Sequence, residues 1–400
     1  MPRLPPFLIP LILINLTGHM ALSGGRLSGS LYVLQTGQPE AFVGLFMALF
    51  SVLPVITSLA IGRWVDRAGA ARVIRVGVVL VLIGAWTPIV KLSLPTLMIM
   101  AVLIGFGFNI MSVASQHTVG HLVAKASSSE RLANYGWFAL GHSASATLGP
   151  FIAGFLIDSV SFKAAFACMA GSVCVSAILV FTRTKGLPVQ RFTLAAADQV
   201  KPSQSKVKRD VLDLLATPEM RRIYWVNAMT ATAWDLFIVM LPILGHRLGY
   251  SAAVIGTVFS LFALGTFIAR ALLPSLSRKF NEWQILRAAL VIICLVFFIL
   301  PWAVIAPLLM ALGLVFGCAV GTSQPSMLSL LHSAAPPGRG GEAVGLRSVL
   351  SNSCSVVVPL MFGAALATVS VPVLMVVGGV IIASGLKPAH SGVLARQFSH

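Results

Sequence analysis

The chain has 400 residues, of which 57% are hydrophobic and 10% are charged, and its formal net charge is +17. A soluble domain carries about 25% charged residues, so this composition leaves no room for a soluble catalytic domain. The positive charge does not indicate nucleic-acid binding. Its basic residues are spread over separate breaks between apolar runs, not gathered with exposed aromatic residues on one folded face.

Twelve apolar runs fill most of the chain, and each is close to the roughly 20 residues that a membrane-spanning helix needs. Helix is the expected structure because the edges of an open sheet cannot be satisfied in lipid. The first run continues to Gln35 without a small-residue cleavage site, so we interpret it as a span and not as a cleaved signal peptide. The expected spans are 7–35, 41–61, 73–94, 96–119, 133–157, 162–182, 222–245, 252–273, 284–302, 304–328, 343–367 and 370–386.

Most basic residues lie in or beside alternate loops and in the two tails. The exceptions are Arg26, Lys91, Lys163 and Arg247. Cytoplasmic loops of membrane proteins carry an excess of lysine and arginine. The pattern therefore predicts an integral, multi-pass protein of the bacterial inner membrane with both termini in the cytoplasm.

One long polar stretch, 183–221, divides the spans into two sets of six. We expect a six-helix bundle over 1–182, a cytoplasmic linker over 183–221, a second six-helix bundle over 222–387 and a cytoplasmic tail over 388–400. The two halves also match in residue type at offsets near 210, which is typical of transporters that bind substrate at the midplane between two repeats. The matches include Asn15 with Asn227, Gly44 with Gly256, Pro150 with Pro359, and Gly154 with Gly363.

The loop after the second span carries a pattern of glycines and charges made of Gly62, Asp66, Arg67, Gly69 and Arg72. It resembles the signature loop of the major facilitator superfamily, although Ala71 stands where a basic residue is usual. The resemblance implies twelve transmembrane helices in two pseudo-symmetric six-helix bundles, an all-α membrane fold.

In that family the signature loop helps to latch the cytoplasmic side, which implies this role for Asp66 and Arg67. We expect Gly62 to allow close helix approach, Gly69 to permit a tight turn, and Asp66 to oppose the positive end of a neighbouring helix. The alternative is that Arg67 and Arg72 only determine topology.

The equivalent loop of the second half keeps basic residues, including Arg278, but has no acid. Glu130 and Glu342 precede the fifth and eleventh spans. Either could pair with Arg67, Arg72 or Arg278 on the cytoplasmic face, or could remain a solvated acid.

The fifth span carries Gly141, Gly149, Pro150 and Gly154. This set is similar to the glycine-rich motif of drug/proton antiporters, although three residues separate Pro150 from Gly154 and the second glycine of the motif is missing. Small residues let transmembrane helices approach closely, so we expect the fifth and eighth spans to cross tightly here. Ordinary helix packing is the alternative interpretation.

Polar residues inside the spans are the candidates for chemistry. In the first span Asn15, His19, Ser23 and Arg26 recur at helical spacing and share one face. In the seventh span Asp235 is the only carboxylate deep in any apolar run, and Asn227 and Thr232 lie near its face. An ionisable residue within a span usually faces the bundle interior and is a functional candidate.

The family resemblance implies that the first and seventh spans line a central cavity, so we expect Arg26 and Asp235 to face it from opposite halves. A nearby cation stabilises a carboxylate, so Asp235 could release a proton when Arg26 approaches and regain it when they separate. Arg26 could instead bind an anionic substrate, and Asp235 a cationic one. A permanent ion pair without transport chemistry is the structural alternative. His19 could relay protons or simply be a hydrogen-bonded structural residue.

The remaining candidates are polar residues of four other spans, for which packing is the alternative reading: Asn109, His142, Gln324 and Asn352. The sequence has no phosphate-binding loop and no Cys/His ligand set, so we expect no cofactor, no metal and no ATP-driven pumping. An ion gradient would supply the driving force.

We therefore predict a non-enzymatic secondary transporter of small organic molecules. We expect proton-coupled efflux from a protein that functions as a monomer in the lipid bilayer. The alternatives are an importer or facilitator of an organic anion and, from another class, a membrane sensor that transports nothing.

Overall fold

The computed structural model describes residues 7–122, 128–183, 211–336 and 339–397. In these ranges the chain is helical, with no β-strand. Twelve of the described helices are long and apolar enough to cross a membrane, and each overlaps an expected span. The prediction of an all-helical, twelve-span protein is confirmed.

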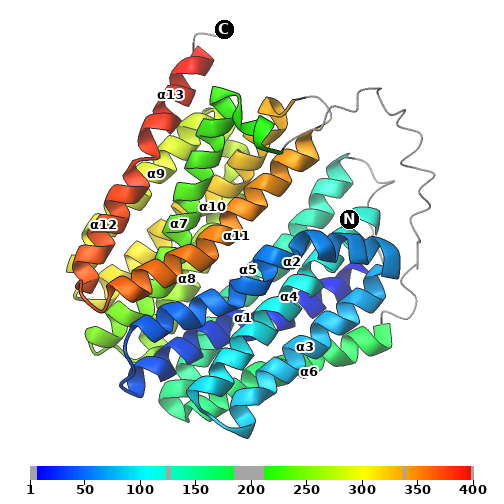
Figure 1. Cartoon of the computed structure of the whole chain (residues 1–400), viewed down its shortest axis with the longest axis vertical. Helices are drawn as coiled ribbons and strands as arrows, with labels where there is room; N and C mark the ends of the chain where they lie inside the picture. The colour runs from blue at the N-terminus through cyan, green and yellow to red at the C-terminus, as the bar shows by residue number, and fades with distance from the viewer. Residues whose placement is uncertain (1–6, 123–127, 184–210, 337–338, 398–400) are drawn as a thin grey trace. The chain divides into compact units, whose positions relative to one another are not determined.

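The first half of the sequence forms α1 (Leu8–Gln35), α2 (Ala41–Ala68), α3 (Ala70–Val90), α4 (Leu94–Leu122), α5 (Ser128–Ser159) and α6 (Phe162–Arg183) (Figure 1). A short 3₁₀ helix follows at Val211–Leu215. The second half forms α7 (Pro218–Arg247), α8 (Ala252–Leu276), α9 (Glu282–Ile299), α10 (Ala306–Ala334), α11 (Gly340–Ala365), α12 (Val371–Ala383) and α13 (Leu386–Gln397), with a 3₁₀ turn at Leu300–Trp302.

α7 begins four residues before the expected span because its start is capped. The Thr217 hydroxyl accepts a hydrogen bond from the Met220 amide at 3.3 Å, and Pro218 occupies the first turn, where it removes no helical hydrogen bond. Glu219 lies in the first turn and Arg247 in the last, which suits the helix dipole at both ends.

At the other end of the chain, residues expected to be a tail form α13, which packs against α9 and α7.

Contacts divide the chain into two compact units that do not follow the two halves of the sequence. Unit 1 comprises 1–26, 49–149 and 160–209, and unit 2 comprises 27–48, 150–159 and 210–400. Unit 2 thus contains all of the second half together with one end each of α1, α2 and α5. The division into bundles at 1–182 and 222–387 stays a prediction.

Within unit 1, α3 packs along α4 and against α6. Val73, Ile74 and Val78 of α3 are fully buried in an apolar cluster that also contains Met111 of α4. A Cβ on Gly77 would lie 2.7 Å from the Gly107 carbonyl oxygen, and glycine at both positions lets the two backbones meet.

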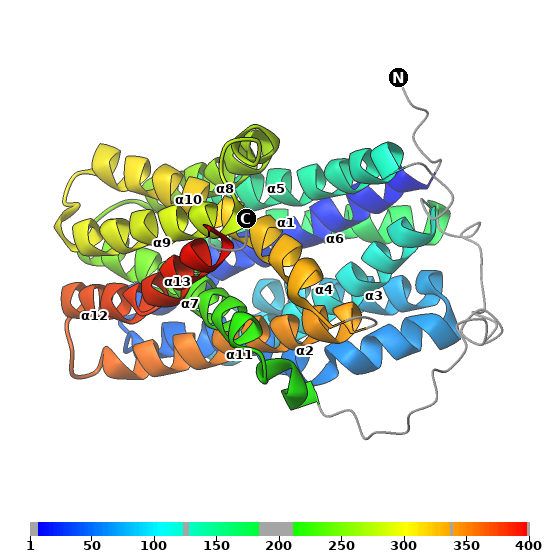
Figure 2. The ribbon, with the colours of Figure 1, turned by 90° about the horizontal axis from the view of Figure 1, so that it is seen from above.

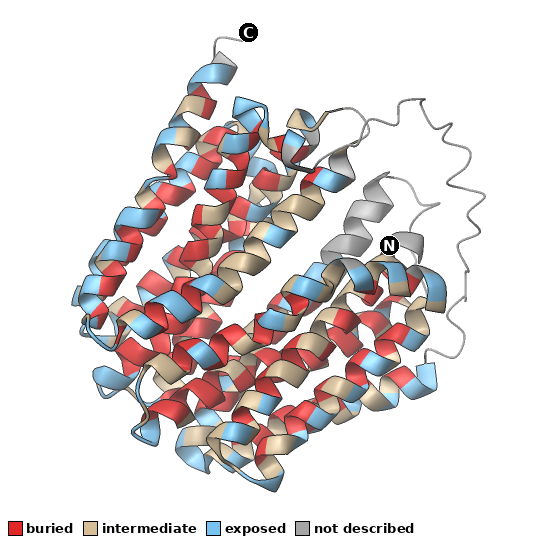
Figure 3. Ribbon diagram, viewed as in Figure 1, coloured by how far each residue is buried: buried red, intermediate tan, exposed pale blue. Residues whose placement is uncertain are grey.

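Within unit 2, α8 packs along α10, α7 along α11, and α9 along α12 (Figure 2). An aromatic cluster joins four of these helices, α7 to α10, with the rings of Phe237 and Phe316 stacked at 4.4 Å between centroids. α12 buries Val371, Leu374, Met375 and Gly378, three or four residues apart, and exposes apolar residues between them (Figure 3). An apolar exposed face is what contact with lipid requires.

Two glycine-lined crossings lie at the end of unit 2 that carries the turn 36–40, which we call the 36–40 end. At the first crossing α2 meets α11, and a Cβ on Gly363 would lie 2.8 Å from the Gly44 Cα. At the second, α5 meets α8. A Cβ on Gly154 would lie 3.1 Å from the Ala253 Cα, and one on Gly256 would contact the Pro150 carbonyl group.

The two crossings are equivalent in the sequence repeat, because Gly44 matches Gly256 and Gly363 matches Gly154. The expected close approach of the fifth and eighth spans therefore lies at Gly154. Gly141 and Gly149 lie instead against α1, where a Cβ would meet Ile12 and the Met20–Gly24 backbone respectively.

Substitution of Gly363 by alanine should destabilise the protein by about 1–3 kcal/mol, because the new methyl group must push two backbones apart. Gly345 lies on the same helix, and a Cβ there would meet no described atom within 4 Å. Gly345→Ala should therefore leave stability unchanged or raise it slightly. The apparent melting temperature in detergent compares the two variants, and an equal effect of both would contradict the tight crossing.

Candidate functional site

The polar residues of the first span meet polar residues of α5 and an aromatic ring of α4 inside unit 1. His19 is buried, and its ring lies 3.9 Å from the His142 ring and 5.1 Å from the Phe108 ring, measured between centroids. His19 Nδ1 lies 2.8 Å from Ser145 Oγ. The structure thus brings together two of the predicted site residues, His19 and His142, on neighbouring helices.

The hydrogen bonds of Ser145 determine how His19 is held. The hydroxyl of Ser145 donates to the His142 carbonyl oxygen at 2.7 Å. A hydroxyl has one proton to give, so Ser145 Oγ accepts from His19 Nδ1–H. In the neutral ring this leaves the lone pair at Nε2, where it can accept a proton or a substrate donor.

Arg26 lies about two turns further along α1 than His19, also in unit 1. Its guanidinium carbon is 5.0 Å from the centroid of the Phe50 ring, a cation–π contact. Arg26 and His142 both interact electrostatically with His19. One face of α1 and its neighbours therefore present one permanent cation and two imidazole rings beside aromatic rings.

The other predicted residues of unit 1 are arranged as follows. The Ser23 hydroxyl donates to the Ser145 carbonyl oxygen at 3.2 Å, which ties α1 to α5. The Asn15 amide donates within its own helix to Leu11 at 2.9 Å. Asn109 of α4 donates to the Ser58 hydroxyl of α2 at 3.2 Å. Asn15 and Asn109 thus make structural contacts in this structure.

In unit 2, Asp235 is 9% exposed and accepts a hydrogen bond from the Ser355 hydroxyl of α11 at 2.9 Å. Ser355 was not among the predicted residues. No pattern in α11 marks it, since its position opposite Asp235 depends on how α7 and α11 pack. The carboxylate therefore has a donor partner on the neighbouring helix.

Other hydrogen bonds continue this contact along the α7–α11 interface. Asn227 donates to the Ser351 hydroxyl at 3.0 Å, and the Thr232 hydroxyl donates to the Cys354 sulfur at 3.9 Å. We call these α7 and α11 side chains, together with Asp235 and Ser355, the α7–α11 polar seam. Asn352 is a partly exposed neighbour of the seam on α11.

Gln324 lies outside the seam, on α10. Its side-chain oxygen accepts from the Arg270 guanidinium of α8 at 3.4 Å, near the end of the α8 span. Arg26 belongs to unit 1 and Asp235 to unit 2, so a pairing between these two residues stays a prediction.

The loop that resembles the family signature is a single-residue connection. α2 ends at Ala68, α3 begins at Ala70, and Gly69 between them has φ of 81°. Gly69 permits this tight turn, as expected from its place in the loop. At Gly62 a Cβ would meet no described atom within 4 Å, and the close helix approach expected there stays a prediction.

Among the charged latch candidates, Arg67, Arg72 and Arg278 are exposed. Glu342 pairs with Arg339, three residues earlier on the chain, with 2.6 Å between Arg339 Nη2 and Glu342 Oε2. In the described structure Glu342 therefore has a partner that the sequence did not suggest, a neighbour one helical turn away. The side chains of Asp66 and Glu130 lie outside the described residues.

Sequence reasoning missed three charged residues at the 36–40 end of unit 2. Glu40 and Arg247 form a salt bridge, and the Asp158 carboxylate accepts from two backbone amides of α8. A signal for the first pair existed, because Arg247 is one of the few basic residues outside the alternate-loop pattern. For Asp158 the only indication was that it is one of just 11 acidic residues in the chain.

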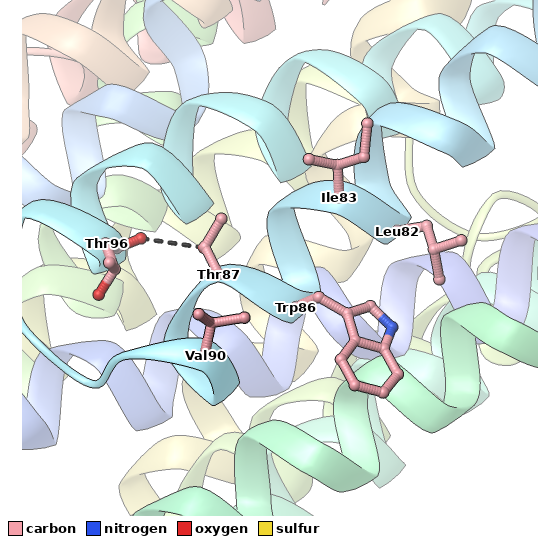
Figure 4. Close-up of a pocket in the computed structure, with 6 residues that line it drawn as sticks. All are labelled: Leu82, Ile83, Trp86, Thr87, Val90 and Thr96. Atoms are coloured by element: carbon pink, nitrogen blue, oxygen red, sulfur yellow. Dashed lines mark hydrogen bonds between the residues drawn. The ribbon is translucent and has the colours of Figure 1, made fainter.

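An apolar groove of about 610 Å³ lies in unit 1 between the end of α3 and the start of α4 (Figure 4). Trp86 and Val90 border it and are strongly exposed, and Thr87 donates across it to the Thr96 carbonyl oxygen at 3.1 Å. It contains none of the predicted site residues and no charged side chain. Within the described ranges, no three His, Cys, Asp or Glu side chains gather in a group able to hold a metal ion.

Substitution of Ser145 by alanine should destabilise the protein by about 1–3 kcal/mol, because it leaves the buried His19 Nδ1–H without its acceptor. Ser159 lies on the same helix, and its exposed hydroxyl donates to Phe155 at 2.7 Å. Ser159→Ala should change stability by less than about 0.5 kcal/mol. Apparent melting temperatures in detergent test the difference, and a neutral Ser145→Ala would rule out the proposed role of this hydroxyl.

Comparison with known proteins places the chain in a family. A search of curated protein sequences gave no significant match. Similar solved structures include a POT family transporter in complex with a thioalcohol-conjugated peptide. It is 12% identical with a TM-score of 0.78, covering 97% of this chain and 95% of that chain.

The nucleoside transporter NupG is also similar, at 12% identity and a TM-score of 0.77, covering 96% of this chain and 99% of that chain. A peptide transporter POT in complex with sulfate is 16% identical with a TM-score of 0.74, covering 98% and 94% respectively. Likeness at these identities shows the fold. The sequence model of the Major Facilitator Superfamily matches residues 11–359, so the chain belongs to this superfamily of membrane transporters.

Proposed function

We propose that the protein is a proton-coupled exporter of small organic molecules that works by alternating access. It would function as a monomer in a bacterial inner membrane, with both termini in the cytoplasm. Membership of the superfamily supports transport. The glycine-rich sequence of α5, similar to that of drug/proton antiporters, is the reason for proposing export.

The observation that carries the proposal is the buried carboxyl group of Asp235 in the seventh span. A charge at a helix centre costs roughly 2.5–3.5 kcal/mol on insertion scales, and an ion pair or carboxylate is a poor way to stabilise a core. Asp235 accepts a hydrogen bond from Ser355, which can stabilise a carboxylate and can also remain when the group is protonated. A group that tolerates both states is suited to proton exchange.

His19 and Arg26 would complete the site from unit 1. His19 is held through Nδ1, which leaves Nε2 for a proton or a substrate. Arg26 has a planar, permanently charged group beside an aromatic ring. We propose that Arg26 either favours the ionised form of Asp235 or holds the substrate, and that Asn227, Thr232 and Asn352 contribute polar contacts.

On the cytoplasmic side we propose that the α2–α3 loop latches the protein shut, with Asp66 and Arg67 as the charged members. The single-residue turn at Gly69 supports this role, because it leaves only one residue between the end of α2 and the start of α3. Arg72 and Arg278 are exposed and available for contacts on this face.

A second candidate is import of an organic anion. Arg26 in unit 1 favours it, since its guanidinium group is permanently charged and its planar set of donors suits an anion. A similar structure is described as a peptide transporter in complex with sulfate, which is an anion. A membrane sensor without transport remains the candidate from another class.

A ligand-stabilisation screen across pH should first identify compounds that raise the melting temperature, because binding to the native state stabilises it. With such a compound, uphill transport in the wild type should follow an imposed proton gradient. Asp235→Asn should abolish this coupling, since the amide exchanges no proton, and Arg26→Gln should weaken coupling or substrate affinity. The matched control is Asp213→Asn at an exposed acid of the 3₁₀ helix.

Inverted and right-side-out vesicles distinguish export from import in the same assay. Substrate movement out of the cytoplasmic space against its gradient supports export, and movement inward supports the anion importer. Full proton-coupled transport by both Asp235→Asn and Arg26→Gln would end the proposed mechanism. Compounds that bind without any flux would favour the sensor.

A further inference from the structure

Two electrostatic contacts join separate helices at the 36–40 end of unit 2. The first is a two-point salt bridge between Glu40, just before α2, and Arg247, in the last turn of α7. Arg247 Nε lies 2.6 Å from Oε1 of Glu40, and Nη2 lies 2.8 Å from Oε2. The planar guanidinium group and the carboxylate match in both distance and direction, which is the strongest form of such a pair.

The second contact is between the C-terminal end of α5 and the N-terminal end of α8. Asp158 Oδ1 accepts from the Ala252 amide at 3.0 Å, and Oδ2 accepts from the Ala253 amide at 2.7 Å. Ser251 caps the next amide, that of Val254, at 3.4 Å. The side chain of Asp158 therefore supplies acceptors that the first turn of α8 lacks.

The position of Asp158 on its own helix is unfavourable. It lies in the last turn of α5, where the backbone carbonyl groups already make the helix end negative. The same carboxylate is favourable at the positive N-terminal end of α8. Asp158 is thus stabilised by α8 and not by α5, and it loses this stabilisation if the two helix ends separate.

Both contacts lie beside the glycine-lined crossings of unit 2. The α5–α8 crossing at Gly154 is one helical turn from Asp158, and the α2–α11 crossing at Gly44 is one turn from Glu40. The close approach of the backbones brings these carboxylates within hydrogen-bond distance of their partners. Each contact joins a helix of the first half of the sequence to a helix of the second half.

We propose that Glu40, Arg247 and Asp158, with the first turn of α8, form a two-point clasp that controls opening of the protein at the 36–40 end. The three side chains are positioning residues. They bind no substrate but set the proportion of molecules that are closed at this end. The proposal rests on the proposed function only in requiring that the 36–40 end open and close during alternating access.

A third contact at the same end supplies an internal control. The Tyr250 hydroxyl donates to the Val304 carbonyl oxygen at 2.6 Å, and both residues belong to turns of the second half. Opening between the halves would break the clasp but leave this contact unchanged. Loss of the clasp should therefore alter distances between α1 and α7 and leave distances between α7 and the 300–302 turn as they are.

The test measures distances by electron paramagnetic resonance on the full-length protein in liposomes, without substrate or proton gradient. The five native cysteines are first replaced by alanine, and spin labels are attached to cysteines introduced at the exposed residues Gln35 and His246. The control pair is His246 with Trp302, which is 74% exposed and lies in the second half.

Asp158→Asn and Glu40→Gln should each raise the ratio of long to short Gln35–His246 distances by about 1.5- to fivefold, from the usual size of dipole and exposed ion-pair contacts. Ala252→Pro should act like Asp158→Asn, because it removes one amide donor at a helix position where proline is otherwise favourable. The control distance should stay unchanged in all of them.

Exchange of charges provides the rescue. Glu40→Arg combined with Arg247→Glu should restore the population of molecules with the short Gln35–His246 distance, which either single change lowers. An unchanged Gln35–His246 distribution in both Asp158→Asn and Glu40→Gln would overturn the clasp, as would a double exchange no better than the single changes.

A change in the control distance as well would also overturn the proposal, since it would indicate a general structural role. The measurement is independent of the Asp235 transport test. Failure of proton coupling with an intact clasp response refutes only the proposed coupling, and the reverse result refutes only the clasp.

Discussion

The need to satisfy every polar group without water determines how this protein is built. In the hydrocarbon core an unpaired backbone amide or charge costs several kcal/mol, so the chain is helical throughout the described spans and carries few charges. Several of the charges that it keeps contact an identified partner. Asp235 accepts from Ser355, Arg26 lies on Phe50, and Glu40 pairs with Arg247. The candidate site and the clasp are both exceptions to an otherwise apolar composition.

Small residues determine where the helices of this protein come into close contact. Lipid is as apolar as leucine, so transmembrane helices associate by close packing and not by burial of apolar surface. At the 36–40 end, helix backbones approach each other closely at the Gly44–Gly363 and Gly154–Ala253 contacts. They also place Glu40 and Asp158 near their partners. Packing and electrostatics at this end therefore depend on the same few positions, and a methyl group at a crossing would disturb both.

The polar residues divide into two kinds according to what they contact. The side-chain NH₂ groups of Asn15 and Asn109 donate structural hydrogen bonds, and Glu342 pairs with Arg339 on its own turn. His19, His142 and Asp235 are different, because each is an ionisable group held by neighbours from another helix. A titratable side chain fixed in place by its neighbours is what coupling of proton movement to shape change would require.

The sequence alone determined the twelve spans, the superfamily, the turn at Gly69 and the ionisable residues of the first and seventh spans, because hydropathy, glycine and charge act locally along the chain. It did not determine partners. Ser355 lies opposite Asp235, Ser145 orients His19, and Asp158 binds the start of α8 only because helices distant in sequence pack in one register. Such contacts depend on the rotation and approach of whole helices, which the tertiary packing of side chains decides and a local pattern does not encode.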